Sequence, residues 1–336
     1  MKFLVIRFSS LGDVVLTTAL FPNLKKKWPE CEIHFLTKPA YAPVLNGNPF
    51  VSRVLFFESG SGAFSTLRRK LQEERYDAVV DLQGNLKSLL LRLAIRAPKS
   101  IVVQKCAWAR RKLVWFKRMS PQLRLSVRER ILECAQRLGA AIPETETLLY
   151  PQDVERVLQR VSIPSEARLV AVAPGAQHGT KRWLPEYFAQ AANELAAFPN
   201  TVLLILGNEA DREVADKIAS KLVVSHRNLA GKTSLSELIA ITSKLSLLLT
   251  NDSGILHVAE ALSIPLVAVF GPTVRGFGFA PYKKTSRVVE IVNMACRPCT
   301  LHGSKLCPLG HHNCMREIDS GVVLLAASSL LEGSTV

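Results

Sequence analysis

Short apolar runs alternate with amphipathic stretches over the first part of the chain. Apolar residues recur at helical spacing over Asp13–Trp28, Ala63–Glu74 and Leu86–Ile95. Runs rich in Val, Ile, Leu and Phe separate these stretches and read as buried strands: Lys2–Phe8, Glu32–Thr37, Arg53–Phe57 and Ala78–Leu82. Strands that alternate with helices predict a mainly parallel α/β sheet.

The same alternation restarts after residues 142–167, a stretch with three prolines that we interpret as a linker. The expected strands are Leu169–Ala173, Thr201–Leu206, 245–249 and Pro265–Phe270. The expected helices are Pro185–Ala196, Ala210–Leu222, Leu235–Ser243, 255–262 and a terminal helix, Ser320–Leu331. The pattern therefore predicts an α/β protein of two Rossmann-like domains that face a cleft, over residues 1–155 and 165–336.

Composition narrows the class of protein. The chain has 336 residues, 48% of them hydrophobic, and no apolar stretch long enough to span a bilayer. The N-terminus does not read as a signal peptide, so we expect a cytosolic protein. The net charge of +15 indicates an anionic partner. Cations crowd Lys99–Arg130, among Trp108 and Trp115; this segment fits a membrane-facing surface or a solvated helix face equally well.

One turn in the second half is suited to binding a diphosphate. The apolar run 245–249 ends in Asn251-Asp252-Ser253-Gly254, and a helical pattern follows at once. Such a turn presents backbone N–H groups and the positive end of a helix dipole at the carboxyl edge of a parallel sheet. Ser253 adds a hydroxyl, and Gly254 permits close approach. An ordinary helix cap explains the same residues.

Two further loops follow strands of the second half. The sequence Pro174-Gly-Ala-Gln-His-Gly-Thr-Lys-Arg-Trp183 places Lys181 and Arg182 just before a helix, where both could neutralise a phosphate. A surface loop with incidental charge is the alternative. Glu209 ends the next strand, at the position where an acidic residue binds ribose hydroxyls in related folds. A lone Glu there also suits a helix N-terminus.

The first half offers a carboxylate rather than a dinucleotide fingerprint. Asp13 follows the first strand, in Arg-Phe-Ser-Ser-Leu-Gly-Asp, at the start of a helix. A carboxylate there could accept a proton from a substrate hydroxyl, or it could merely cap the helix. The segment Asp81–Ser88 ends another strand and supplies polar groups on the same side. We assign to this acceptor side Ser9, Ser10, Gly12, Gln83, Asn85 and Lys87.

Four cysteines cluster near the C-terminus, in the pattern C-x2-C-x7-C-x6-C. Disulfides are a poor interpretation if the protein is cytosolic. The thiolates could hold a structural Zn or Fe ion, or they could stay reduced and metal-free. The four residues are Cys296, Cys299, Cys307 and Cys314.

Taken together, these motifs resemble glycosyltransferase family 9, the ADP-heptose:lipopolysaccharide heptosyltransferases. The resemblance covers nearly the whole chain, in order: VIRFSSLGDVVLTTAL, DLQGNLKS, PGAxxGxKRW, TNDSGxxHVAxAL with FGPT, and the cysteine-rich tail. It implies a GT-B fold, with an acceptor-binding domain over 1–155 and an ADP-sugar-binding domain over 165–336. The tail occurs in only part of the family, so membership says nothing about its metal content.

The resemblance also implies roles for individual residues. Asp13 is similar to the family's general base, and Lys181, followed by Arg182, to the residues that grip the donor phosphates. Asp252, Ser253 and Gly254 resemble the diphosphate turn, with His257 on the helix that follows. Glu209 is similar to the ribose contact, and Thr233 lies in the adenine-side segment.

The implied activity is inverting transfer of heptose from ADP-L-glycero-D-manno-heptose to the inner core of lipopolysaccharide, either Kdo or the first heptose. No cofactor is required. The expected partners are ADP-heptose, a lipid A–Kdo or heptosylated core acceptor, and the cytoplasmic face of the inner membrane through the basic segment. A family-9 enzyme that glycosylates a protein remains an alternative. Two other classes stay open: a nucleic-acid-binding module, which lacks a supporting motif, and a sugar-nucleotide epimerase.

Overall fold

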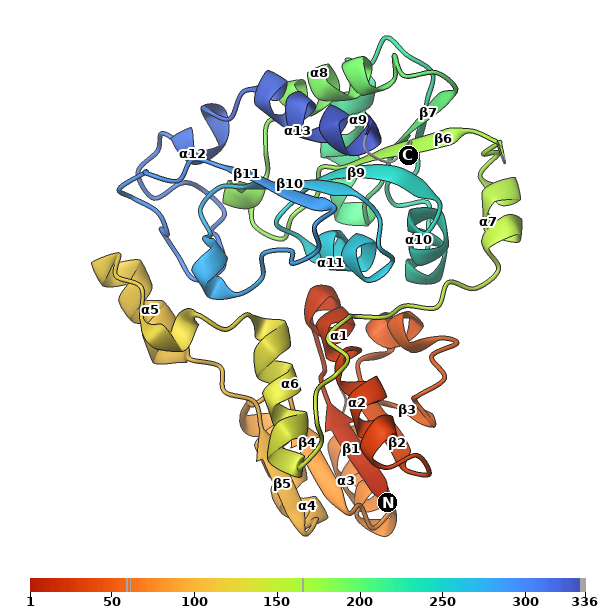
Figure 1. The fold of residues 1–336 in the computed structure, drawn as a ribbon, viewed down its shortest axis with the longest axis vertical. Helices are drawn as coiled ribbons and strands as arrows, with labels where there is room; N and C mark the ends of the chain where they lie inside the picture. The colour runs from red at the N-terminus through yellow and green to blue at the C-terminus, as the bar shows by residue number, and fades with distance from the viewer. Residues whose placement is uncertain (59, 61, 165, 333–336) are drawn as a thin grey trace. The chain divides into compact units, whose positions relative to one another are not determined.

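The computed structural model describes residues 1–58, 60, 62–164 and 166–332. The chain forms two compact units (Figure 1). Unit 1 comprises Met1–Cys106 and Leu125–Tyr150, and unit 2 comprises Ala107–Arg124 and Pro151–Val336. Residues 165 and 333–336, at the two ends of the expected second domain, lie outside the described residues.

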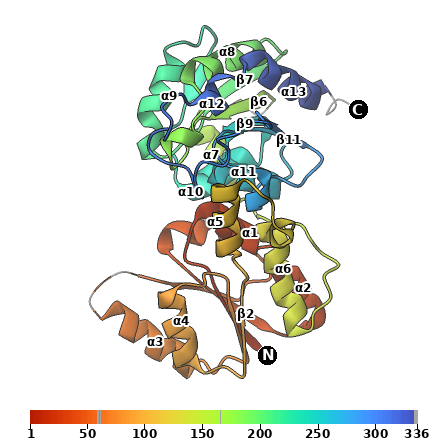
Figure 2. The same ribbon diagram turned by 90° about the vertical axis from the view of Figure 1, so that its left-hand side faces the viewer.

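Unit 1 is built on a five-stranded parallel sheet of order β3-β2-β1-β4-β5. Helices α3 and α4 cover one face, and α1, α2 and α6 cover the other (Figure 2). The strands are β1 (Lys2–Ile6), β2 (Glu32–Thr37), β3 (Arg53–Phe56), β4 (Ala78–Asp81) and β5 (Lys99–Val102). The helices are α1 (Leu11–Thr17), α2 (Leu20–Lys27), α3 (Ala63–Glu73), α4 (Leu86–Ile95) and α6 (Val127–Leu138), with a 3-10 turn η1 (Pro39–Leu45).

The apolar runs explain why this sheet forms. Phe3, Leu4, Val5 and Ile6 of β1 are all fully buried, as a central parallel strand covered on both faces requires. The stretch expected as one helix, Asp13–Trp28, is instead two helices, α1 and α2. Pro22 has no N–H to bond the carbonyl four residues earlier, so the helix restarts with Pro22 in its first turn.

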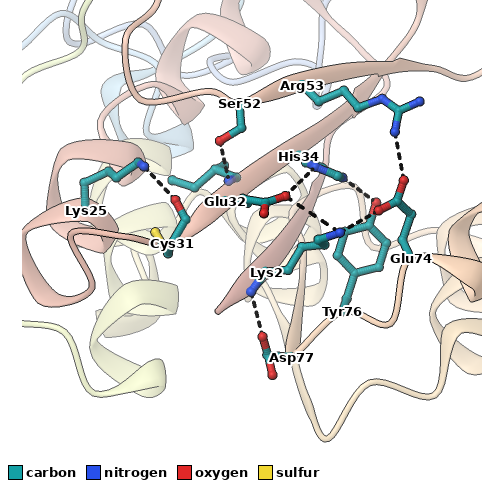
Figure 3. Close-up of polar contacts among 11 residues, drawn as sticks. Lys2, Lys25, Cys31, Glu32, His34, Ser52, Arg53, Glu74, Tyr76 and Asp77 are labelled. Atoms are coloured by element: carbon teal, nitrogen blue, oxygen red, sulfur yellow. Dashed lines mark hydrogen bonds and ion pairs between the residues drawn. The ribbon is translucent and has the colours of Figure 1, made fainter.

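A polar network ties together the amino ends of the unit 1 strands (Figure 3). Lys2 of β1 bonds Glu74 at 2.7 Å, and Glu74 also pairs with Arg53 of β3 at 2.8 Å. The buried His34 of β2 lies between Tyr76, 2.9 Å from its Nδ1, and Glu32, 3.5 Å from its Nε2. These groups fix the sheet at the edge opposite to the predicted chemistry.

Unit 2 has a six-stranded parallel sheet of order β11-β10-β9-β6-β7-β8. Helices α8, α9 and α13 pack on one face, and α7, α10 and α11 on the other (Figure 1). The strands are β6 (Arg168–Ala173), β7 (Thr201–Ile205), β8 (His226–Asn228), β9 (Leu245–Asn251), β10 (Leu266–Phe270) and β11 (Ser286–Glu290). The helices are α7 (Val154–Arg160), α8 (Pro185–Leu195), α9 (Arg212–Ala219), α10 (Leu235–Thr242), α11 (Gly254–Ala261), α12 (Asn313–Arg316) and α13 (Ser320–Glu332), with 3-10 turns η3 (Gly179–Lys181), η4 (Glu209–Asp211) and η5 (Arg275–Phe277).

Residues 107–124 depart from the expected division of the chain. They form α5 (Ala107–Phe116) and η2 (Pro121–Leu123), and they pack with unit 2 although unit 1 precedes and follows them. The Lys117 ammonium donates to the carbonyls of Cys296 and Pro298 at 3.2 and 2.6 Å. The expected first domain, 1–155, therefore includes a segment that belongs with the second unit.

The cationic stretch Lys99–Arg130 is accordingly divided between the two units. Its middle part lies on unit 2, and its two ends lie on unit 1. Arg130 is buried in α6 rather than exposed. Among the described residues, no helix combines the length and the apolar character needed to cross a bilayer.

Candidate active site

In unit 1, the predicted acceptor-side residues collect at the carboxyl ends of two neighbouring strands. β1 and β4 pair in parallel, with Ile6 opposite Asp81. The chain leaves β1 through Arg7–Ser10 into α1, and it leaves β4 through Leu82–Asn85 into α4. Register and strand direction therefore bring both predicted motifs to the same edge of the sheet.

Asp13 lies in the first turn of α1 and is held as a carboxylate. Its oxygens accept hydrogen bonds from the backbone N–H of Ser10 at 3.1 Å and from the Ser10 hydroxyl at 2.7 Å. The Arg7 guanidinium lies 2.6 Å away, and both side chains are only 13% exposed. Burial alone would raise the pKa of Asp13, but Arg7 and the Ser10 bonds outweigh it and hold the pKa below its usual range. Asp13 thus contributes to the helix cap and is also a desolvated, ionised carboxylate.

Arg7 is a residue of this sheet edge to which the sequence analysis assigned no role. Besides Asp13, it bonds the carbonyl of Ser9 at 2.8 Å and the carbonyl of Leu82 beyond β4. One guanidinium therefore ties the ends of two strands to the start of α1. The sequence did contain a signal for this ion pair. Arg7 directly follows a buried strand and precedes Asp13, in the first turn of a helix, by six residues.

The other acceptor-side residues surround this pair unequally. The Gln83 side chain accepts from the backbone N–H of Phe8 at 2.9 Å, so it joins the two loops. Lys87 lies over the Phe57 ring, 5.6 Å from its centroid, and Phe57 stacks on Phe8. Asn85 is used to cap α4 through the N–H of Ser88. Ser9 contributes its carbonyl to Arg7, and Gly12 is buried in α1.

In unit 2, the lysine loop and the diphosphate turn meet at the carboxyl ends of β6 and β9. These strands are neighbours, with Ala173 opposite Thr250. The Lys181 ammonium lies 2.6 Å from a carboxylate oxygen of Asp252, and that oxygen also accepts the Thr273 hydroxyl at 2.7 Å. Asp252 is therefore the ion-pair partner of Lys181. This role suits a carboxylate, because a carboxylate in direct contact with a diphosphate would be repelled by it.

The turn after β9 has the predicted form. Ser253 precedes α11 with extended backbone, and Gly254 is the first residue of the helix. The Thr250 and Ser253 hydroxyl oxygens are 3.3 Å apart. His257 is buried one turn into α11, near the Phe279 ring. The start of α11 therefore directs its first N–H groups and its positive dipole end to the sheet edge that carries Lys181.

The remaining donor-side residues spread along the same edge. The Arg182 guanidinium bonds the Ala176 carbonyl at 2.9 Å and lies 3.5 Å from Asp211, so it braces the loop. Glu209 lies in η4 after β7, largely exposed, 3.1 Å from Arg212. Thr233 follows β8, just before Ser234 caps α10. Strand order thus places Lys181, Glu209 and Thr233 after three consecutive strands, β6, β7 and β8.

The cysteine-rich tail braces the lysine loop. The backbone N–H and the hydroxyl of Thr180 both donate to the Ser304 carbonyl, at 3.0 and 2.9 Å. The Thr180 hydroxyl oxygen in turn accepts from the N–H of Ser304 at 2.8 Å. His312 bonds the Thr180 carbonyl at 2.9 Å. The segment that carries the cysteines therefore holds the backbone next to Lys181.

The four cysteines are reduced neighbours. Burial, together with Cys296 beside it, raises the pKa of the Cys299 thiol to about 11, and burial raises that of Cys314 to about 12. At Cys307, backbone N–H groups of residues 309–312 lower the pKa despite some desolvation. Within the described part of the chain, no group of three or more His, Cys, Asp or Glu residues is arranged to hold a metal ion. Zinc or iron binding by these cysteines stays a prediction.

The chain is similar to proteins of one known family. The family model described as glycosyltransferase family 9 (heptosyltransferase) matches residues 64–309. The chain belongs to glycosyltransferase family 9. It is 28% identical to lipopolysaccharide heptosyltransferase 2 of Escherichia coli, over 87% of this chain and 88% of that one. It is 25% identical to lipooligosaccharide heptosyltransferase 2 of Haemophilus influenzae, over 81% and 84% of the two chains.

A solved structure shares the whole architecture. The structure of E. coli ADP-heptose LPS heptosyltransferase II covers 100% of both chains, with a TM-score of 0.81 and 25% identity. The expected GT-B fold, with two parallel α/β sheets, is thereby confirmed. The protein is an enzyme of the heptosyltransferase class.

Proposed function

We propose that the protein transfers heptose from ADP-L-glycero-D-manno-heptose to the inner core of lipopolysaccharide, onto Kdo or the first heptose. The names of its relatives support the donor and the acceptor class. The observation that carries the proposal is Asp13, a desolvated and ionised carboxylate at the sheet edge of unit 1. A carboxylate in this state is suited to accept a proton from a sugar hydroxyl.

The reaction is a single displacement. The acceptor oxygen forms a bond to the anomeric carbon, and the bond from that carbon to the β-phosphate oxygen breaks. The hydroxyl proton passes to Asp13, and ADP leaves with the electron pair. One displacement inverts the anomeric centre. The Arg7 guanidinium keeps Asp13 ionised and aimed before the proton arrives.

Negative charge grows on the departing diphosphate, and groups of unit 2 stabilise it. Lys181 supplies a positive charge. Asp252, which accepts a hydrogen bond from Thr273, fixes the position of the lysine ammonium. The N–H groups and hydroxyl at Ser253 and Gly254 add dipoles at the start of α11. These groups can offset the leaving-group charge without a cation, so we propose that the transfer is metal-independent and needs no cofactor.

The nucleoside end of the donor then lies toward β7 and β8. Neighbouring strands are about 4.8 Å apart, so the loops after β7 and β8 lie within reach of a nucleoside whose phosphates sit at β6. Glu209 supplies a carboxylate for the ribose hydroxyls, and Thr233 lies on the adenine side. Arg182 acts by bracing the lysine loop through Ala176, and His257 supports the turn from within α11.

A lipid-linked acceptor implies contact with the cytoplasmic face of the inner membrane. Residues 107–124 carry six Lys and Arg residues and no acidic residue. Trp108 and Trp115 on α5 are 65% and 62% exposed. Cations with exposed tryptophans suit an anionic interface. We therefore propose that this segment makes the peripheral membrane contact.

The test is mass spectrometry of products from ADP-heptose with defined, truncated lipopolysaccharide acceptors. We expect one added heptose on a Kdo- or heptose-terminated acceptor, unaffected by EDTA. Asp13→Asn should lower turnover by roughly 10²–10⁴-fold while ADP binding stays near wild type. Transfer to a protein acceptor but to none of the core acceptors would replace this proposal with the protein-glycosylating alternative.

A further inference from the structure

Helix α4 of unit 1 has apolar side chains on two opposite faces. Leu91 and Ile95 point into the core and are buried. Leu86, Leu90 and Leu93 are 70%, 47% and 60% exposed. Their spacing of four and three residues places them in one stripe on the outer side of the helix. An exposed helix normally carries polar residues there, so this stripe is suited to being covered.

One cation lies beside the stripe, and another ends the helix. On a helical projection, Lys87 lies beside the leucines. The exposed Arg96 is the C-cap residue of α4. Residues 86–96 contain no acidic residue. Arg92 instead lies toward the core side of the helix, where it is 3.8 Å from the buried Asp81 and donates to the Ser100 hydroxyl. A leucine strip edged by cations matches a surface that is apolar within and anionic at its boundary.

The neighbouring helix adds to this charge. α3 exposes three successive cations, Arg68, Arg69 and Lys70, and the Gln72 side chain joins it to the Ala94 carbonyl of α4 at 2.9 Å. Arg69 has an acidic neighbour, Glu73, at 4.0 Å. The two helices lie side by side on one face of the sheet (Figure 2). Together they give this part of unit 1 a net positive outer surface.

The position of the stripe relates it to the candidate site. Leu86 directly follows Asn85, which caps α4, and Lys87 lies over the Phe57 ring, which stacks on Phe8 in the loop before α1. Whatever covers the leucines therefore lies on the same helix as two acceptor-side residues.

We propose that the leucine stripe of α4 docks unit 1 on an anionic lipid bilayer. Leu86, Leu90 and Leu93 enter the boundary between headgroups and acyl chains. The exposed cations beside them, Lys87, Arg96 and those of α3, meet lipid phosphates. A second copy of the chain fits less well, because symmetric pairing of two stripes would bring like charges together. The inference rests on the proposed function, since a lipid-linked acceptor must be met at a membrane, and it adds a contact separate from residues 107–124.

The test is co-sedimentation of the full chain with phosphatidylcholine vesicles, with and without phosphatidylglycerol. The triple variant Leu86→Gln, Leu90→Gln, Leu93→Gln should bind the anionic vesicles at least ~10-fold more weakly than the wild type, because three apolar side chains no longer partition. The matched control is Val322→Gln with Leu325→Gln, two residues of α13 that are 54% and 75% exposed. It should bind like the wild type.

Two further measurements separate the outcomes. Turnover of ADP-heptose with a deacylated, water-soluble core acceptor should be equal in the wild type and the triple variant; absence of transfer in both would refute the proposed function, not the docking. Unchanged vesicle binding by the triple variant would overturn the docking. The docking would also be overturned if light scattering showed that the wild type is a dimer and the triple variant a monomer that binds vesicles with unchanged affinity. The single variants Leu86→Gln and Leu93→Gln supply smaller steps if the triple variant is unstable.

Discussion

At the scale of single residues, each unit has one charge pair at the carboxyl edge of its sheet. Arg7 holds Asp13 in unit 1, and Asp252 holds Lys181 in unit 2. The positions of Asp13 and Lys181 were predictable because each follows a strand in a recognisable motif. Their partners' roles were not, since Arg7 reads as the polar end of a strand, and Asp252 reads as part of an anion-binding turn. Which ions pair depends on side-chain directions that spacing alone does not give.

Removing the positive charge beside Asp13 should move the pH dependence of the reaction. With Arg7 present, the pKa of Asp13 is depressed, so the carboxylate proposed as the base stays ionised well into acid. In Arg7→Met, burial is no longer offset, the pKa of Asp13 rises, and the acid limb of kcat/KM shifts to higher pH. Arg53→Met, which breaks an ion pair at the other edge of the sheet, should leave the limb in place. An unmoved acid limb in Arg7→Met would contradict the pairing.

Lys181→Ala should weaken donor binding and turnover together. A charge-assisted bond to phosphate is worth about 1.5–3 kcal/mol, which corresponds to roughly 10–100-fold in ADP affinity. Isothermal titration with ADP and steady-state kinetics measure the two effects. Lys217→Ala is the control, since this lysine pairs with Glu213 on the exposed side of α9. Wild-type affinity and turnover in Lys181→Ala would exclude the lysine from the donor site.

At the scale of elements, the apolar pattern located most strands and helices to within a few residues. β5, α5 and α6 were missed because cations crowd residues 99–130 and were interpreted as surface. In α6, Ile131, Leu132, Ala135 and Leu138 keep a helical apolar period beneath the charge. The brace between the cysteine-rich tail and the lysine loop could not be predicted, since it joins segments more than 120 residues apart.

That brace leaves no room for a side chain at Gly179. A Cβ there would lie 2.5 Å from the backbone oxygen of Lys305. Gly179→Ala should therefore push the tail from the loop, lower the stability by about 1–3 kcal/mol, and raise KM for the donor by displacing Lys181. Urea unfolding and kinetics are the measurements. Gly60→Ala, at a glycine with open space around it, is the control; equal behaviour of the two variants would show that the brace is not tight.

At the scale of the whole molecule, stability should depend on pH through the buried His34. Burial, with Lys2 and Arg53 nearby, lowers its pKa, although Glu74 and Glu32 oppose the shift. The folded state therefore keeps His34 neutral while the unfolded chain takes up a proton below about pH 6.5, so stability falls as the pH drops through this range. Urea unfolding near pH 7.5 and 5.5, within about one unit of that value, should show a smaller loss in His34→Gln than in the wild type. An equal loss would rule out His34 as the titrating group.

The packing of residues 107–124 with unit 2 has a consequence for recombination between relatives. Three peptide connections join the units, at 106/107, 124/125 and 150/151, so a single crossover near residue 150 would separate α5 from the carbonyls and apolar residues that seat it. A chimera of two relatives should therefore take residues 107–124 from the parent that donates unit 2. A chimera that takes residues 107–124 from the other parent would pair α5 with a unit 2 that it does not fit, and we expect it to be less stable.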